Sequence, residues 1–338
     1  MKALIYLGNE TVEIQEIDRS RRADNEVVIR VAHAGICGTD LHIFLGDMTQ
    51  RVTPPHVMGH EMCGEVAEAP PDLDVSVGDR VIVEPTVFCG RCPACRRGHT
   101  HVCQNLNFMG CDSPGAFQEY WAVPADRLHK VPDSLSDEEG AMIEPLTVAV
   151  HDVRRVGVAL GDRAVVIGGG PIGLLVALMA RLDGAEVIIS EVNPFRVEQA
   201  KAFGFRTVNP QGEDLSQFVD DWTGGAGADL VFEVSGSASG ARVMTDLVRV
   251  RGTIGLVGVH ATPPPVDLHQ FFFRELSLVA CRVYEPVDFD RAIRIAASGQ
   301  IDLKAMISKV IPLADAQRGF EEMKNGGDVM KVLLDCRG

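Results

Sequence analysis

Long apolar runs are missing from this sequence. No window of its 338 residues reaches the roughly 18 consecutive apolar positions that a membrane-spanning helix requires. The first residues, MKALIYLGNETVEIQEI, also lack the longer apolar stretch and the small-residue cleavage site of a signal peptide. We therefore expect a cytoplasmic protein that makes no contact with a membrane.

Positive charge is also scarce. Lysine and arginine number 32 against 47 aspartates and glutamates, which gives a net charge of −15. A nucleic-acid-binding protein more often carries a basic stripe, and this sequence has none, so we expect no nucleic-acid partner. Internal repeats and low-complexity segments are absent as well. With 46% apolar and 23% charged residues the composition is that of a globular protein, and the length predicts two domains.

Cysteine, by contrast, is concentrated in one place. Four of the nine cysteines fall in FCGRCPACRRGHTHVC (88–103), separated by gaps of two, two and seven residues. Four thiolates can surround one Zn²⁺ and leave no position for water or substrate, which predicts a structural zinc site. The alternative is a set of free thiols in an unusual loop. The four residues are Cys89, Cys92, Cys95 and Cys103. The cysteines without paired spacing we interpret as small buried apolar residues: Cys63, Cys111, Cys281 and Cys336.

A second group of metal-ligating residue types lies earlier in the chain. GICGTDLH contains Cys37 at the end of a predicted strand (26–36), and GHEMCGEV contains His60 and Glu61. A sulfur, an imidazole and a carboxylate suit zinc, and three protein ligands leave a fourth position for water or an alcohol. The spacing alone is weak evidence, because a cysteine and a histidine this far apart are unrelated in most proteins.

Segment 162–196 has the pattern of a strand, a glycine turn, a helix and a second strand. Its apolar run leads into Gly168-x-Gly170-x-x-Gly173, where the N-terminus of the helix would face a pyrophosphate. Glu191 follows the second strand, and a carboxylate there hydrogen-bonds ribose hydroxyls and repels a 2′-phosphate, which favours NAD over NADP. Arg196 lies nearby, and an arginine at this position by itself would admit NADP.

Further strand and helix patterns alternate through residues 206–259, which predicts an α/β fold with a doubly wound parallel sheet. Residues 1–149 are rich in short strands and turns, and we expect them to form one domain with the tail, 285–338. Residues 150–284 would form the second domain, which binds the cofactor.

The order of these motifs resembles that of the zinc-dependent medium-chain alcohol dehydrogenases. GICGTDLH, GHEMCGEV, VGDRV, the four-cysteine segment and IEPLTVAVH follow one another as in that family, over nearly the whole chain. The similarity looks closest to the polyol (sorbitol-like) and threonine dehydrogenase branches. It implies a mainly β, GroES-like catalytic domain, a Rossmann domain that binds NAD, two zinc ions per chain (one catalytic and one structural), and a homodimer or homotetramer.

The resemblance also implies a ligand set for the catalytic zinc. Cys37 and His60 would bind the ion, with Glu61 or Glu144, or both in exchange, as the third ligand. Asp40 would orient His60. The alternative for Asp40 and Glu144 is a carboxylate near the start of a helix.

The resemblance also implies which residues transfer the proton of the alcohol. Thr39 would accept the proton of the alcohol, and His42 would pass it to water. The alternatives are a helix N-cap for Thr39 and a surface position for His42. Gly38 departs from the ethanol-oxidising branch, in which a basic residue follows the ligand cysteine, and argues against a simple ethanol dehydrogenase.

For the cofactor, the glycine turn and the carboxyl ends of the later strands supply the contacts. Ser235, Val257 and Val259 fall at strand ends, and the resemblance implies that they line the nicotinamide. Arg282 would touch cofactor or substrate, although a plain surface arginine is an equal alternative. The glycine turn would contribute Gly168, Gly170, Pro171, Ile172 and Gly173.

The expected reaction is the oxidation of a secondary alcohol, a polyol, sugar alcohol or sugar acid, with NAD as the hydride acceptor. Small-molecule alcohols would thus be the substrates. The alternatives are an L-threonine 3-dehydrogenase, a butanediol-type dehydrogenase, or a cofactor-binding protein without activity.

Overall fold

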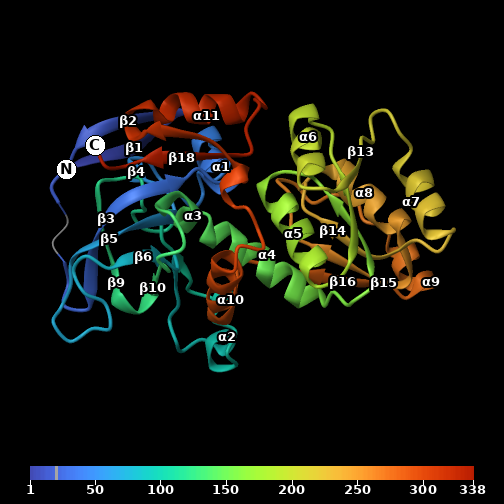
Figure 1. Ribbon diagram of the computed structural model, residues 1–338, viewed down its shortest axis with the longest axis horizontal. Coiled ribbons are helices and arrows are strands. Elements are labelled where there is room, and N and C mark those ends of the chain that lie inside the picture. The colour runs from blue at the N-terminus through green and yellow to red at the C-terminus, as the bar shows by residue number, and fades with distance from the viewer. Residues whose placement is uncertain (20–21) are drawn as a thin grey trace. The chain divides into compact units, whose positions relative to one another are not determined.

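The computed structural model describes residues 1–19 and 22–338 (Figure 1). The chain forms two compact units: a first unit of Met1–Glu144 and Glu285–Gly338, and a second unit of Pro145–Tyr284. The sequence pattern places the first of these boundaries slightly later, at 149/150. Within the described residues, no helix combines the length and apolar character needed to cross a membrane.

The first unit is built on a seven-stranded sheet. Six strands follow the order β10-β6-β5-β3-β18-β17, and β9 also pairs with β3. The strands are β3 (Glu26–Gly35), β5 (Glu61–Glu68), β6 (Arg80–Val83), β9 (Tyr120–Pro124), β10 (Leu128–Lys130), β17 (Ile307–Pro312) and β18 (Lys331–Asp335). β3 is buried along almost its whole length, because it pairs with β5, β18 and β9. The tail strand β18, red in Figure 1, therefore completes a sheet begun by the N-terminal residues.

Smaller elements complete this unit. A three-stranded sheet has the order β2-β1-β4, and β7 pairs with β8. These strands are β1 (Lys2–Gly8), β2 (Thr11–Glu16), β4 (His56–Val57), β7 (Thr86–Val87) and β8 (Asn107–Phe108). The helices are α1 (Gly38–Leu45), α2 (Pro93–Arg96), α3 (Asp137–Ala141), α10 (Pro286–Ala297) and α11 (Ala316–Lys324). Ser136 starts α3 with a capping box to Glu139.

Antiparallel pairing explains which strand ends meet. Gly35 at the end of β3 pairs with Glu61 at the start of β5, and it pairs with Leu333 of β18 on the other side. The chain continues from β3 through Cys37 into α1, where Cys37 is the N-cap residue. The end of β3 therefore lies beside the starts of β5 and β18, and residues from three distant segments meet there.

The second unit contains a six-stranded sheet in which every pair is parallel, in the order β13-β12-β11-β14-β15-β16. The strands are β11 (Arg163–Ile167), β12 (Glu186–Ser190), β13 (Arg206–Val208), β14 (Ala228–Glu233), β15 (Val248–Leu256) and β16 (Ser277–Ala280). The helices of this region are α4 (Ile143–Val156), α5 (Pro171–Leu182), α6 (Pro194–Ala202), α7 (Leu215–Thr223), α8 (Ala238–Leu247) and α9 (Leu268–Arg274). The predicted parallel α/β sheet is confirmed.

The order in which the chain adds strands to this sheet changes direction once, although all the strands are parallel. From β11 the chain moves outward to β12 and β13, and then returns to add β14, β15 and β16 on the opposite side. Ligands of such sheets bind outside the carboxyl ends of the strands at this reversal. A cofactor of this unit is therefore expected outside the carboxyl ends of the neighbouring strands β11 and β14.

Candidate functional site

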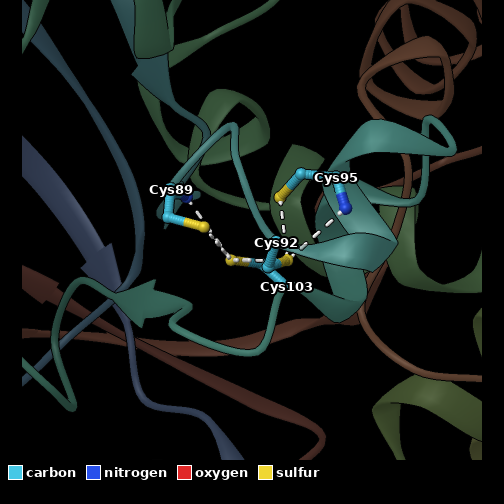
Figure 2. Close-up of side chains that lie close together, drawn as sticks. All are labelled: Cys89, Cys92, Cys95 and Cys103. Carbon is cyan, nitrogen blue, oxygen red and sulfur yellow. Dashed lines mark hydrogen bonds between the residues drawn. The ribbon is translucent and has the colours of Figure 1, made fainter.

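The four clustered cysteines come together around one point (Figure 2). Their ligand atoms all lie within 4.8 Å of one another. The sulfur of Cys92 is 3.5 Å from that of Cys95 and 3.9 Å from that of Cys103, which is 3.5 Å from that of Cys89. None of these four cysteines forms a disulfide. We refer to these four residues as the cysteine lobe.

The geometry of the cysteine lobe fits zinc. A tetrahedral ion with Zn–S bonds of ~2.3 Å separates its sulfurs by about 3.8 Å. Backbone N–H groups already point at the sulfurs: Cys95 donates to Cys92 Sγ at 3.5 Å, and Cys89 donates to Cys103 Sγ at 3.4 Å. Such donors stabilise thiolates, which are the form that binds a metal.

A second set of donor atoms lies at the end of β3. Cys37, His60 and Glu61 each offer one ligand atom, and these atoms also lie within 4.8 Å of one another. His60 and Glu61 are buried, and Cys37 is partly buried. We refer to these three residues as the open cluster, because three protein ligands would leave a fourth coordination position for water or a substrate.

Asp40 links the two segments that supply the open cluster. Its Oδ2 accepts a hydrogen bond from the N–H of Cys37 at 2.9 Å, and its Oδ1 accepts one from the N–H of Gly59 at 3.2 Å. The same Oδ1 lies 3.7 Å from Nδ1 of His60. Asp40 is completely buried, and this burial raises its pKa above the ordinary value. The carboxylate thus holds the start of α1 against the residues before β5.

Lys331, which the sequence pattern did not reveal, also reaches the open cluster. It begins β18, its side chain is 3% exposed, and its ammonium group forms an ion pair with Oε2 of Glu61. Gly35 leaves the necessary space: a Cβ atom there would lie 2.2 Å from Glu61 Oε2 and 3.0 Å from Lys331 Cε. The only sequence signal was a lysine at the border of the apolar strand MKVLLDC.

The electrostatics of the open cluster favour a bound cation. Burial lowers the pKa of His60, but Asp40 and Cys37 outweigh it and raise this pKa well above the ordinary value. For Lys331, burial is likewise outweighed by Glu61 and Cys37, so its pKa is raised. Among the described residues, Glu61 Oε1 has no hydrogen-bond partner, and Nδ1 of His60, which also has none, faces Asp40 at 3.7 Å. A buried carboxylate oxygen without a partner, in a negative potential, fits a zinc ion.

The structure places Glu144 near the open cluster but not in it. Glu144 is 6% exposed, and its charge helps to raise the pKa of His60 after the larger effects of burial, Asp40 and Cys37. It is not among the three residues whose ligand atoms converge. The carboxylate that directly accompanies Cys37 and His60 is that of Glu61.

The two residues predicted to transfer a proton both lie on α1. Thr39 is partly buried, two residues after Cys37. His42 is exposed, and its Nδ1 lies 2.9 Å from the Oδ2 of Asp47. This contact involves one of the two ring nitrogens of His42, whose side chain is 47% exposed.

The glycine turn of the second unit joins β11 to α5. Gly168 has a φ of +102°, and a Cβ atom there would lie 3.0 Å from the backbone of Ser235. A Cβ atom on Gly173 would lie 1.8 Å from the carbonyl oxygen of Gly168. Gly170 is the N-cap of α5, and Pro171 and Ile172 open the helix. The bare N–H groups of this helix start fit a pyrophosphate.

Glu191 and Arg196 lie beside this turn. The Glu191 carboxylate accepts hydrogen bonds from the N–H groups of Gly169 at 2.7 Å, Val192 at 2.7 Å and Asn193 at 2.8 Å. A Cβ atom on Gly170 would lie 3.5 Å from Nη1 of Arg196. The Nε of Arg196 is buried and has no hydrogen-bond partner in the described chain.

The remaining predicted cofactor contacts follow β14 and β15. Ser235 lies two residues after the end of β14, and the N–H of Val257 donates to the carbonyl of Glu233 at 2.9 Å. Val259 is 82% exposed, and Arg282 is exposed as well. Exposed apolar and basic groups at the carboxyl ends of strands are compatible with a ligand that covers them.

Comparisons with known proteins agree with this architecture. Residues 23–133 match the alcohol dehydrogenase GroES-like domain, and residues 171–298 match the zinc-binding dehydrogenase family. A solved structure described as a zinc-binding dehydrogenase of Sinorhizobium meliloti 1021, bound to NADP, has a TM-score of 0.91 and 31% identity, and covers 99% of this chain and 98% of its own.

Three curated relatives span nearly the whole chain. A 2-dehydro-3-deoxy-L-galactonate 5-dehydrogenase of Pseudoalteromonas atlantica is 49% identical over 99% of both chains. An L-threonine 3-dehydrogenase of Alteromonas mediterranea is 34% identical over 99% of both. An L-galactonate-5-dehydrogenase of Escherichia coli is 32% identical over 92% of both.

The chain therefore belongs to the zinc-dependent medium-chain alcohol dehydrogenase family, as its motifs predicted. It is an oxidoreductase with a GroES-like domain and a Rossmann-type domain.

Proposed function

We propose that this protein oxidises a secondary hydroxyl group of a sugar acid and transfers the hydride to NAD. The observation that carries the proposal is the open cluster, in which a thiol, an imidazole and a carboxylate converge within 4.8 Å. In this proposal the first unit supplies the zinc chemistry and the second unit binds the dinucleotide.

Cys37, His60 and Glu61 would hold the catalytic zinc, and the cysteine lobe would hold a structural zinc. When bound at an open site, zinc polarises the substrate hydroxyl and lowers its pKa, by about nine units if the effect matches that on water. Such a shift corresponds to ~12 kcal/mol at about 1.36 kcal/mol per unit. One oxyanion hydrogen bond supplies only ~3–4 kcal/mol, so the metal ligands matter more than any single donor.

The side chains of α1 would move the proton. Thr39 Oγ1 can accept the proton of the hydroxyl while donating its own. His42 would then release it to solvent through Nε2, because Asp47 occupies Nδ1. Asp40 keeps Cys37 and the residues before β5 in register, which supports a role in orienting His60.

In this proposal the Glu61 carboxylate has two competing partners, the zinc ion and Lys331. Its Oε1 is free of hydrogen bonds in the described structure, while its Oε2 is held by Lys331. We propose that Glu61 would hold the metal through Oε1, that Lys331 would compensate the charge of its Oε2, and that Glu144 would be the second carboxylate available to the ion.

The cofactor proposal is NAD in preference to NADP. Three N–H groups hold the Glu191 carboxylate beside the glycine turn, and a fixed negative charge there repels a 2′-phosphate. The unpartnered Nε of Arg196 favours the opposite preference, and the relative of known structure from S. meliloti binds NADP. Measuring kcat/KM with both dinucleotides decides between them, and equal values would contradict the preference for NAD.

The substrate proposal follows the similarity to the sugar-acid dehydrogenases. Two relatives are named for oxidation at position 5 of a galactonate, and one of them is 49% identical to this chain. The second candidate is L-threonine, supported by a relative that is 34% identical over the full length.

A substrate panel tests the proposed function. The purified, zinc-loaded protein is given 2-dehydro-3-deoxy-L-galactonate, L-galactonate, L-idonate, sorbitol or L-threonine with NAD⁺, and NADH is followed by its absorbance. We expect the highest kcat/KM with one of the sugar acids, and a kcat lowered by about 10³-fold or more in a Cys37→Ser variant. A higher kcat/KM with L-threonine would replace the proposal with its alternative.

We also propose that the protein is a homodimer or homotetramer. β16 lies at the edge of the parallel sheet, and Leu278 on it is 45% exposed. On α9, before it, Phe272 and Phe273 are 78% and 68% exposed. Unpaired strand edges with apolar side chains favour association between chains. Light scattering after size exclusion would show a monomer if this proposal is wrong.

A further inference from the structure

Glu233 is a buried carboxylate that the proposed chemistry does not use. It is the last residue of β14 and is 0% exposed. Its Oε1 accepts hydrogen bonds from the hydroxyl of Ser235 and from the N–H of Ser235 at 3.1 Å. Its Oε2 accepts one from the N–H of Gly236 at 3.3 Å. A buried carboxylate needs such donors, so the loop after β14 is arranged around this charge.

The imidazole of His260 lies against the Glu233 carboxylate. Nε2 of His260 lies 3.1 Å from Oε2 of Glu233, and the side chain of His260 is 11% exposed. Within the described residues, no lysine or arginine forms an ion pair with Glu233. When the imidazole is neutral, the negative charge of the carboxylate is solvated by N–H and O–H dipoles but is not cancelled.

The position of Glu233 in the sheet relates it to the cofactor. Ile167, the last residue before the glycine turn, pairs with Glu233 on one side and with Ser190 on the other. Glu191 follows Ser190 directly. Two carboxylates therefore stand at the same level of the sheet, one on each side of the glycine turn, at the place where the strand order reverses.

Glu233 also joins the loops that follow β14 and β15. Its carbonyl oxygen accepts hydrogen bonds from the N–H groups of Val257 at 2.9 Å and Gly258 at 2.8 Å. A Cβ atom on Gly258 would lie 2.7 Å from Oε2 of Glu233, and one on Gly240 would lie 2.6 Å from Oε1. The carboxylate thus occupies space that two glycines leave open, beside the segments expected to line the nicotinamide.

We propose that Glu233 positions these loops and selects the oxidised cofactor, NAD⁺, over NADH. This inference rests on the proposed function, in which NAD binds at this edge of the sheet. Glu191 on the β12 side would meet the adenosine half, which is identical in both forms. Glu233 on the β14 side would meet the nicotinamide half, which is positively charged only when oxidised. A fixed carboxylate therefore attracts NAD⁺ more strongly, by roughly tenfold in affinity or more at an effective dielectric constant of about 20.

The experiment compares the Kd of NAD⁺ with the Kd of NADH in the zinc-loaded protein, by calorimetry and by NADH fluorescence. In Glu233→Gln, which keeps the shape but removes the charge, we expect the Kd of NAD⁺ to rise about tenfold while that of NADH changes less than about twofold. Glu191→Gln is the matched control, because it removes a charge from the other side of the turn. It should change both Kd values by one common factor.

Two further measurements keep the test decisive if Glu233→Gln is poorly folded. Thermal unfolding reports the folded state of each variant, and Glu233→Asp shortens the side chain but retains its charge. We expect Glu233→Asp to keep the wild-type ratio of the two Kd values even if both rise. Equal changes of the two Kd values in Glu233→Gln, or a changed ratio in Glu233→Asp, would overturn the inference. A wild-type protein that binds neither dinucleotide would instead refute the proposed function, and that result appears before any variant is made.

Discussion

The cysteine lobe and the open cluster use different parts of the chain to gather metal ligands. The lobe takes four sulfurs from fifteen successive residues, 89–103, and its neighbours hold them with backbone N–H groups. The open cluster takes its donors from the end of β3 and the start of β5, and β18 adds a buried lysine. The lobe is thus organised locally, whereas the open cluster exists only because β3 and β5 pair in one register, and β18 pairs with β3 to bring Lys331 beside it.

The two groups also differ in their charge before a metal binds. The N–H groups of Arg91 and Cys92 lower the pKa of the Cys89 thiol to about 6. At Cys37 burial, followed by the charge of Glu61, raises the pKa of the thiol instead. Backbone N–H groups therefore prepare Cys89 for a cation, whereas burial raises the pKa of Cys95 in the same lobe to about 12. The open cluster depends on Asp40, Lys331 and Glu144 around it. Four experiments test this contrast, and the size of the expected effect decreases from the first to the last.

Removing the thiol of the open cluster should have the greatest consequence. We expect Cys37→Ser to lower kcat by about 10³-fold or more, because the polarisation of the substrate hydroxyl is lost with the metal. The zinc content should fall from about two ions per chain to about one, since the lobe does not depend on Cys37. Metal analysis measures the zinc content. The Kd of NADH should not change, and its measurement shows that the variant is folded. Full activity with one zinc ion per chain would refute the assignment.

Removing a thiol of the lobe should affect stability more than chemistry. We expect Cys103→Ser to lose the lobe zinc and to lower the melting temperature by about 5 °C, equivalent to ~3–4 kcal/mol for a chain of this size. At low temperature kcat should remain within about threefold of the wild type, because a closed site takes no part in the reaction.

Cys63→Ser is the matched control for this experiment, since Cys63 is buried in β5 outside both metal groups. It should retain both zinc ions. Loss of activity in Cys103→Ser at full zinc occupancy of the open cluster would contradict the division of roles.

Replacing the buried lysine should change how the open cluster binds its metal. Lys331→Met leaves the Glu61 carboxylate without its partner, so the metal-free protein should lose ~3 kcal/mol of unfolding free energy. Zinc at this site should bind about tenfold more tightly, because Glu61 no longer has a competing cation. Competition with a chelator and denaturant unfolding measure the two effects.

Lys309→Met supplies the control on the neighbouring strand. Lys309 forms an ion pair with Glu322, but its side chain is 43% exposed. Exposed pairs contribute only about 0–1 kcal/mol, so neither zinc affinity nor stability should change appreciably. If Lys331→Met and Lys309→Met changed the zinc affinity and the unfolding free energy equally, the burial of Lys331 would not be the cause of these effects.

Thiol reactivity should show the smallest but most direct difference. Burial raises the pKa of Cys63 and of Cys111 to about 12, so both stay protonated and unreactive near pH 8. In metal-free protein Cys89 should react first. Because its pKa is lowered, the thiolate is present above about pH 6 and is lost as the pH falls through that value.

Mass spectrometry after brief alkylation at several pH values identifies the labelled peptide. A Cys89→Ser variant should lose the fast phase. A fast phase that survives in Cys89→Ser, or that disappears already at pH 8, would show that the lobe does not lower this pKa.

The sequence was sufficient to predict the features that depend on short stretches of chain. Spacing placed four cysteines in one loop, and the glycine pattern between a strand and a helix predicted the turn at Gly168 and the parallel sheet around it. Such features could be predicted because residues within about fifteen positions are held together by local backbone geometry whatever the rest of the chain does.

Which distant side chains meet could be learned only from the folded chain. The fold placed Glu61 rather than Glu144 with Cys37 and His60, brought Lys331 to them from the far end of the chain, and set His260 against Glu233. These contacts depend on strand register and order, and a shift of one residue along a strand turns its side chain to the opposite face. No local pattern specifies that register, because it results from the packing of the whole unit.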